Sequence, residues 1–394
     1  MPRRHHPHRE DPRGVTVPFI TDRLAAEGVD VGGRASGPSG SRPTDAEFAK
    51  AAVGRVDAAR ILAQLRANVF GQDHAIESIF KTLSVVQAGL TDKTRPLASH
   101  LLVGPTGTGK TEIVRQLASA LRTGPDDFCQ VDMSAMAQEH YAASFAGAPP
   151  GYSGSKEGLS VFDRDRIEGT VSMPGIVLFD EVEKAHTTVL RALLHVLDRG
   201  QLTLANGQQR YDFRNCLVFM TSNLGSRELR AEQERPWHRA GRSVSRLLPA
   251  PAGERVDRIL EGRLDRISEQ SIARFFDPEF LNRIDEVTLF EELSGDTAVE
   301  VARHELDMFA DRARKRGVDL SIDDSVAVHL VETGFDPVYG ARSVRRAIRH
   351  DVWPLVAEAV IAHRAARMAD TASRVSAVLA VDGGAVRCRV GGEG

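Results

Sequence analysis

Residues 101–111 read Leu-Leu-Val-Gly-Pro-Thr-Gly-Thr-Gly-Lys-Thr, an apolar run that leads directly into a glycine-rich loop. The run predicts a buried strand, and the apolar pattern that follows the loop predicts a helix. Glycines let main-chain N–H groups turn inward around phosphate oxygens, and the first turn of the helix adds partial positive charge. The sequence therefore predicts a site for ATP or GTP, formed by Gly104, Pro105, Thr106, Gly107, Thr108, Gly109, Lys110 and Thr111.

Residues 176–181, Ile-Val-Leu-Phe-Asp-Glu, place two carboxylates directly after four apolar residues typical of a buried strand. Ligands gather at the carboxyl ends of parallel strands, so we expect Asp180 to face the same magnesium ion as Thr111. Lys110 is expected to meet the outer phosphates, and Glu181 to polarise the attacking water. The alternatives are a glycine-rich turn with an incidental lysine and a core strand that ends in two solvated acids. The two motifs together favour hydrolysis.

Strand and helix patterns alternate through the middle of the chain. Strand-like runs occur at 98–103, 128–132, 175–180 and 216–221, and helical patterns at 111–122, 155–168 and 187–198. This alternation predicts an α/β fold, with a parallel sheet flanked by helices.

The flanking segments suggest three parts. Residues 1–44 are rich in Pro, Gly and Arg and predict a disordered tail. Residues 45–294 form the predicted nucleotide-binding core, with a Pro- and Arg-rich surface insertion at about 226–265. Residues 295–394 predict a mostly helical subdomain that ends in a small β-hairpin around Asp382-Gly383-Gly384.

Composition narrows the range of partners. The net charge of the 394 residues is only -3, so no global field gathers nucleic acid or anionic lipid. The three cysteines lack metal-ligand spacing, which favours a reducing compartment. No apolar stretch approaches eighteen residues, and the N-terminus lacks a secretory pattern. We therefore expect a cytoplasmic location with neither membrane nor nucleic acid as a partner.

Further motifs follow one another in order along the chain. They are Gly147-Ala148-Pro149-Pro150-Gly151-Tyr152, Asp180-Glu181-Val182-Glu183-Lys184-Ala185-His186, Met220-Thr221-Ser222-Asn223-Leu224-Gly225-Ser226, Pro278-Glu279-Phe280-Leu281-Asn282-Arg283-Ile284-Asp285-Glu286 and Phe335-Asp336-Pro337-Val338-Tyr339-Gly340-Ala341-Arg342. Residues 55–390 thereby closely resemble the second ATPase module of the Clp unfoldases, in particular ClpB and also ClpA and ClpC. The resemblance implies an AAA+ ATPase of P-loop fold with a C-terminal lid, ATP and Mg2+ as cofactors, and a ring of copies, usually a hexamer.

The resemblance also implies roles for single residues. Asn223 corresponds to a polar sensor that orients the attacking water, and Arg342 to a lid arginine that contacts the γ-phosphate. Arg283 corresponds to a finger that reaches the nucleotide of a neighbouring subunit, where a guanidinium stabilises transition-state charge. Val69 and Phe70 correspond to the adenine pocket, and ordinary core packing is their alternative.

Charged surface contacts are the alternative for both arginines. Arg283 would then pair with Asp285 or Glu286, and Arg342 would belong to a charged helix face. Gly151-Tyr152-Ser153-Gly154 resembles the aromatic loop that grips a polypeptide in the pore of these rings, although Ser153 stands where the family usually has valine. A structural turn is the alternative for Tyr152. Asp277 also departs from the family, which has arginine there.

The predicted function is an ATP-dependent unfoldase or remodelling chaperone that threads unfolded or aggregated protein through a central pore. An ATPase subunit of a Clp-type protease is the alternative, although the 225–265 segment lacks an apolar-Gly-apolar tripeptide for docking a peptidase. A nucleic-acid motor is a third reading, without a basic channel to favour it. The sequence leaves open the client, an adaptor and the size of the ring.

Overall fold

The computed structural model describes residues 56–138, 162–170, 172–203, 210–237, 240, 252–366 and 374–391, and only the backbone of 252–261. Residues 1–44 and 45–394 are separate units, and all described residues belong to the second. The predicted tail at 1–44 and the predicted pore residue Tyr152 therefore lie outside the described residues.

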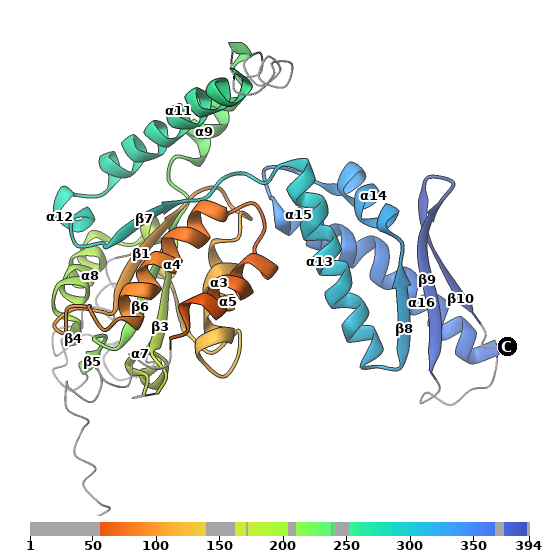
Figure 1. Ribbon diagram of the computed structural model, residues 1–394, viewed down its shortest axis with the longest axis horizontal. Coiled ribbons are helices and arrows are strands. Elements are labelled where there is room, and N and C mark those ends of the chain that lie inside the picture. Colours follow the sequence, from red (N-terminus) through yellow and green to blue (C-terminus); the bar gives the residue numbers. More distant parts are fainter. Residues whose placement is uncertain are drawn as a thin grey trace, which may run out of the picture. The chain divides into compact units, whose positions relative to one another are not determined.

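A five-stranded parallel sheet forms the centre of the fold (Figure 1). Its strands, in spatial order, are β2 (Cys129–Asp132), β3 (Gly175–Asp180), β6 (Cys216–Ser222), β1 (Ala98–Val103) and β7 (Glu286–Leu289). The predicted α/β fold with a parallel sheet is confirmed. The fifth strand, β7, was not predicted, because its four residues include Glu286 and Thr288 and carry little apolar pattern.

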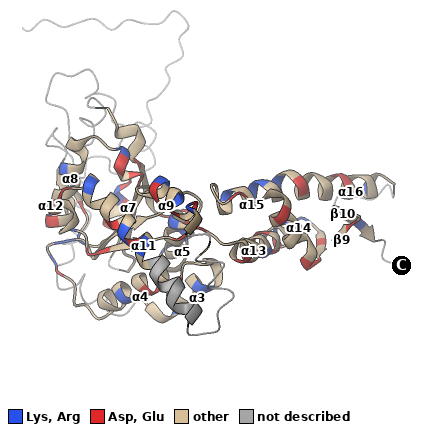
Figure 2. Ribbon diagram, turned by 90° about the horizontal axis from the view of Figure 1, so that it is seen from above, with Lys and Arg blue, Asp and Glu red and all other residues tan. Residues whose placement is uncertain are grey.

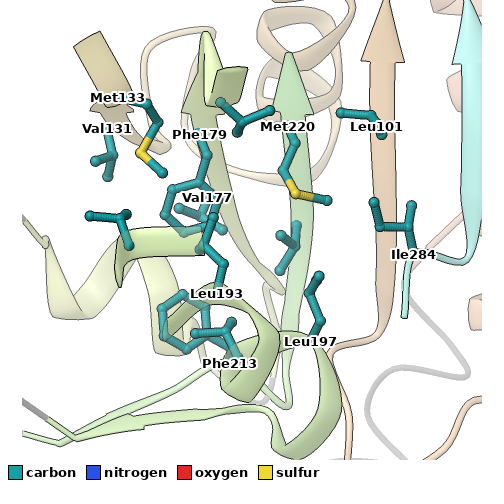
Figure 3. Close-up of a cluster of buried hydrophobic side chains, with 14 of the residues drawn as sticks. Leu101, Val131, Met133, Val177, Phe179, Leu193, Leu197, Phe213, Met220 and Ile284 are labelled. Carbon is teal, nitrogen blue, oxygen red and sulfur yellow. The ribbon is translucent and has the colours of Figure 1, made fainter. Parts of the chain in front are cut away.

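Helices cover both faces of the sheet. One face packs against α3 (Ala58–Asn68), α4 (Asp73–Gln87) and α5 (Lys110–Leu121), and the other against α7 (Arg164–Glu168) and α8 (Thr187–Arg199). Figure 3 shows Val177, Phe179 and Met220 of the strands on the face of the sheet that α8 covers, and Leu193 and Leu197 of α8 belong to the same buried cluster. Because both faces are buried in the middle of the sheet, β3 and β6 are almost continuously apolar.

Short elements connect these layers. Two 3-10 turns, η1 (Met133–Met136) and η2 (Val182–Lys184), follow β2 and β3. A two-stranded antiparallel ribbon consists of β4 (Gln201–Thr203) and β5 (Arg210–Asp212). The predicted helices at 111–122 and 187–198 agree with α5 and α8 to within one residue at each end.

In the described part of the segment between β6 and β7, the helices are α9 (Ser226–Gln233), α11 (Ala252–Phe275) and α12 (Pro278–Leu281). The buried carboxylate of Glu232 on α9 pairs with Arg263 on α11 at 2.5 Å and with Arg235 at 3.2 Å. Helix α11 continues through residue 265 without interruption. The limit of the insertion at 265 and the other predicted domain limits stay predictions.

The C-terminal region is helical with a small sheet, as predicted. It contains α13 (Gly295–Arg314), α14 (Asp324–Gly334), α15 (Ala341–Ala347), the π-helical turn η3 (Ile348–Val352) and α16 (Trp353–Ala366). The expected hairpin, β9 (Val375–Asp382) with β10 (Ala385–Gly391), gains a third strand, β8 (Val318–Ile322), which was not predicted. Figure 2 shows basic and acidic positions interspersed along these helices, in keeping with the small net charge.

Candidate nucleotide-hydrolysis site

The glycine-rich loop joins the end of β1 to the start of α5 and depends on backbone conformations that favour glycine. Gly107 and Gly109 have φ of 79° and 104°. A Cβ atom on Gly107 would lie 2.0 Å from the Tyr339 carbonyl oxygen, and one on Gly104 would lie 2.4 Å from that of Phe290. The loop therefore fits closely against two other segments of backbone.

Lys110 is buried at the first position of α5. Its ammonium donates hydrogen bonds to the carbonyl oxygens of Gly104 at 2.6 Å and Pro105 at 2.7 Å, and to Asn223 Oδ1 at 2.9 Å. Burial lowers the pKa of Lys110 to about 8, although the carboxylates of Glu183, Asp180 and Glu181 act in the opposite direction. A desolvated cation thus lies directly at the predicted phosphate loop.

The two predicted carboxylates follow β3 at the same edge of the sheet. Asp180 accepts hydrogen bonds from Thr221 Oγ1 at 2.5 Å and from Gln130 Nε2 at 3.1 Å. Glu181 follows in the left-handed region, with φ 58° and ψ 53°, and its N–H donates to Thr221 Oγ1 at 3.0 Å. Both acids are therefore held by neutral donors and acceptors from neighbouring strands.

Asn223, two residues beyond Thr221, connects the cation to the second carboxylate. Its Oδ1 accepts from Lys110, its Nδ2 donates to Glu181 Oε1 at 3.3 Å, and its N–H donates to Glu183 Oε1 at 3.1 Å. The amide of Asn223 is thus fixed in orientation by a charged donor on one side and a charged acceptor on the other.

The C-terminal region meets the loop through α15. The N–H of Ala341 donates to the Gly107 carbonyl oxygen at 3.0 Å, which places Arg342 at the pocket. Among the described residues, no carboxylate lies within ion-pairing distance of the Arg342 guanidinium. Arg345, one turn later, pairs with Glu305 at 2.5 Å and with Glu112 at 3.2 Å. The positive charge of Arg342, unlike that of Arg345, is therefore not balanced by an ion pair with a described carboxylate.

These groups line one pocket of about 370 Å³, within the usual range of about 300–1,000 Å³ for ligand sites. The lining includes Val69 and Phe70 together with Leu293, Val301 and His304, and the Phe70 and His304 rings lie 5.4 Å apart. The other predicted residues that line the pocket are Thr106, Gly107, Thr108, Gly109, Lys110, Thr111, Asp180, Glu181, Asn223 and Arg342. Gly104 and Pro105 bind the Lys110 ammonium beside it.

Arg283 does not line this pocket. Its guanidinium pairs with Asp198 at the end of α8, with an N–O distance of 2.6 Å, and its carbonyl oxygen accepts from Arg95 at 2.6 Å. The alternative partners expected for Arg283, Asp285 and Glu286, are wrong, because Arg283 pairs with Asp198 and Asp285 pairs with Arg95. Nothing in these contacts tests the role assigned to Arg283, which stays a prediction.

Sequence reasoning missed Thr221, Gln130, Arg345 and His304. Thr221 could have been found, because it stands at the end of a predicted strand, two residues before the candidate Asn223. Gln130 and His304 carry no local signal, since only the sheet order and the packing of α13 bring them to the site.

The pocket suits a magnesium nucleotide. Thr111 and Asp180 both line the pocket and offer a hydroxyl oxygen and carboxylate oxygens. Mg2+ prefers oxygen ligands, and in proteins it is usually bound by one or two carboxylates together with substrate phosphates. Apolar lining residues, a glycine-rich loop and a buried lysine together define a P-loop nucleotide-binding protein.

Comparison with known proteins narrows this class. One family model, an AAA domain of the Cdc48 subfamily, matches residues 95–287, and a second, the C-terminal D2-small domain of ClpB protein, matches residues 293–373. An ATP-dependent protease ATP-binding subunit-like protein from Rhodococcus erythropolis is 48% identical over 345 residues, which cover 88% of this chain and 92% of the relative. AmiB from Pseudomonas aeruginosa, described in the same words, is 43% identical over 78% of this chain and 81% of its own length.

The chaperone protein ClpB from Vibrio vulnificus is 36% identical over 298 residues, 76% of this chain but only 32% of ClpB. The chain belongs to the Clp family of AAA+ ATPases, and the resemblance inferred from its motifs is confirmed. It is accordingly an ATP hydrolase. Within the described residues, none of the helices combines the length and apolar character needed to cross a bilayer.

Proposed function

We propose that the protein is an ATP-driven unfoldase or remodelling chaperone that assembles as a ring, a hexamer, and threads polypeptide through its centre. One observation carries the proposal: the pocket gathers every predicted catalytic group among the described residues except Arg283. A site that needs this arginine would have to receive it from another copy.

The position of Arg283 supports transfer between copies. Its carbonyl oxygen lies within hydrogen-bonding distance of Ser99 Oγ, at the start of β1, whereas the phosphate loop begins at Gly104, after the end of that strand. Five strand residues span about 16 Å. The Arg283 side chain, which pairs with Asp198, therefore lies near the amino ends of the strands, whereas the pocket of the same molecule lies at their carboxyl ends.

Each of these residues has its own role in the proposed hydrolysis. Thr111 and Asp180 would hold Mg2+, which when bound with ATP supplies positive charge to the phosphate oxygens. Glu181 orients the attacking water and takes up its proton, and Asn223 fixes the Glu181 carboxylate. Lys110 and Arg342 provide fixed positive charge at the phosphates.

Polypeptide contact is assigned to Tyr152, which lies outside the described residues. A tyrosine flanked by glycines offers an amphipathic ring to any side chain or peptide plane, so it suits grip without sequence preference. Tyr152→Ala should retain ATPase activity and lose unfolding of a tagged folded protein, and Tyr152→Phe should retain both. Unfolding by Tyr152→Ala at the wild-type rate would show that the loop has a structural role.

The test of assembly is ATPase activity measured against protein concentration, with and without casein as an unfolded polypeptide. Specific activity should rise with concentration as the ring forms, and casein should change it further. Full activity from a monomer, with no response to casein, would leave only a solitary ATP hydrolase.

A protease subunit is the second candidate, because the relatives from Rhodococcus erythropolis and Pseudomonas aeruginosa are both named as protease ATP-binding subunit-like proteins. Under this reading the ring would pass polypeptide to a peptidase. Co-migration with a peptidase and ATP-dependent degradation of casein would favour it over independent remodelling.

A further inference from the structure

We propose that Thr221 is a positioning residue that sets the geometry of both carboxylates in the hydrolysis site. The inference rests on the roles proposed for Asp180 and Glu181 and adds a residue that lies outside both the glycine-rich loop and the 176–181 run. Three features carry it: the two hydrogen bonds of one hydroxyl, the backbone conformation of Glu181 and the pairing of β6 with β3.

A single hydroxyl serves both acids. Thr221 Oγ1 donates to Asp180 Oδ1 at 2.5 Å and accepts from the Glu181 N–H at 3.0 Å. A hydroxyl has one donor and two acceptor positions, so it makes both bonds at once. Thr221 is 2% exposed, and water therefore does not compete for either bond.

The second bond holds an unfavourable backbone conformation. Glu181 is the one non-glycine residue with positive φ in the described part of the chain. A side chain with a Cβ rarely adopts this region, and such residues persist where surrounding contacts fix them, commonly at active sites. The bond to Thr221 fixes the Glu181 N–H and so sets the direction in which its carboxylate leaves the strand.

The first bond leaves the charge of Asp180 intact. Thr221 binds one carboxylate oxygen, and Gln130 Nε2 binds the other at 3.1 Å. Both donors are neutral, so they fix the plane of the carboxylate without neutralising it. A carboxylate held in this way is oriented and remains fully charged toward a cation.

Strand pairing explains why residue 221 has this role. β3 and β6 are parallel neighbours, and Phe179 pairs with Met220, so the next residues, Asp180 and Thr221, lie side by side where the strands end. Asn223 is two residues further on and binds Glu181 from the same strand end. The end of β6 thus positions the end of β3.

The test is Thr221→Val, which keeps the branched shape and removes the hydroxyl. The turnover number for ATP should fall about 10–100-fold, because the Glu181 N–H and an Asp180 carboxylate oxygen lose their partner. The Kd for ADP should stay within about threefold, and the Mg2+ concentration for half-maximal activity should rise. Thr221→Ser, which restores the hydroxyl, should recover most of the turnover.

Thr288→Val is the matched control. Thr288 is equally buried, in β7 of the same sheet, and its hydroxyl contacts Ser78 rather than the site. Its activity and Mg2+ dependence should match those of the wild type. Should Thr221→Val fail to fold, Thr221→Ala with the same readouts takes its place.

The possible outcomes separate this proposal from the assignments beneath it. If Thr221→Val turns over normally, or Thr221→Ser is as slow as Thr221→Val, the hydroxyl does not position the acids. If Asp180→Asn and Glu181→Gln both turn over normally, the carboxylate roles themselves fail, whatever Thr221 does. Loss of turnover in Thr288→Val of the same size would attribute the effect to sheet packing.

Discussion

Asn223 connects Lys110 to the predicted base, Glu181, through one amide group. Its oxygen receives a hydrogen bond from Lys110, and its nitrogen donates to Glu181. An amide has a donor end and an acceptor end, so it can serve a cation and a carboxylate together, whereas a second carboxylate at this position could not donate to Glu181. The Asn223 amide thus links the positive charge of Lys110 to the carboxylate of Glu181.

Glu181→Gln should reduce ATP turnover by about 10²–10⁴-fold while leaving nucleotide affinity near the wild-type value. The neutral amide keeps the shape of the side chain and no longer takes up a proton from water. Turnover and the Kd for ATP, measured on the same preparation, check this. Glu358→Gln, exposed on α16, is the control, and an equal loss there would contradict the assignment.

The pKa of Lys110 predicts how nucleotide affinity depends on pH. Burial disfavours the charged amine and lowers its pKa from 10.5 to about 8, so the nucleotide-free site loses this positive charge as pH rises through 8. The Kd for ATP should therefore increase between pH 7 and pH 9.5. Lys110→Arg keeps its charge over this range and should give a flatter profile, even if it binds more weakly. Parallel profiles would contradict the prediction.

At the scale of the elements, the sequence predicted what periodicity and motifs encode. Strands 98–103 and 175–180 agree with β1 and β3 because both are continuous apolar runs between clear turn signals. β7 and β8 were missed because they are short and half polar, and only their partners in space make them strands. Likewise the loop residues were predictable from the chain, whereas Gln130 and His304 depend on packing between distant segments.

His100 in the central strand β1 predicts how stability depends on pH. It is 2% exposed, and burial lowers its pKa from 6.5 to about 4, although Asp285 acts in the opposite direction. Between these values the unfolded chain binds a proton that the folded chain does not, so stability falls as pH falls from 6.5 to 4. The depressed pKa corresponds to about 3 kcal/mol over this range.

His100→Phe removes this titration and keeps an aromatic ring beside Phe219, against which His100 stacks at 5.6 Å. The free energy of unfolding, measured by denaturant titration at pH 7 and pH 4.5, should decline less in the variant than in the wild type. The difference between the two proteins isolates the histidine from the carboxylates that also titrate. An equal decline in both would show that His100 does not contribute.

At the scale of the whole molecule, the nucleotide pocket takes residues from the core and from the C-terminal region. The N–H of Ala341 binds the Gly107 carbonyl oxygen, and Arg345 joins Glu112 of α5 to Glu305 of α13. The phosphate loop and α5 are therefore in direct contact with the C-terminal region.

Arg283→Ala tests whether a complete site requires two molecules. Removing a charge that acts on a neighbour's nucleotide should lower turnover by about 10³-fold, while assembly, measured by light scattering, is retained. Arg283→Lys should recover only part of the activity, because an ammonium lacks the planar fork of a guanidinium.

The Arg283→Ala molecule still has an intact pocket of its own, and a Lys110→Ala molecule has a damaged pocket but an intact Arg283. Mixing the two inactive variants should therefore restore activity at interfaces where the Lys110→Ala molecule supplies its arginine. If the mixture stays as inactive as its components, although mixed assemblies form, Arg283 acts within its own chain or on structure alone.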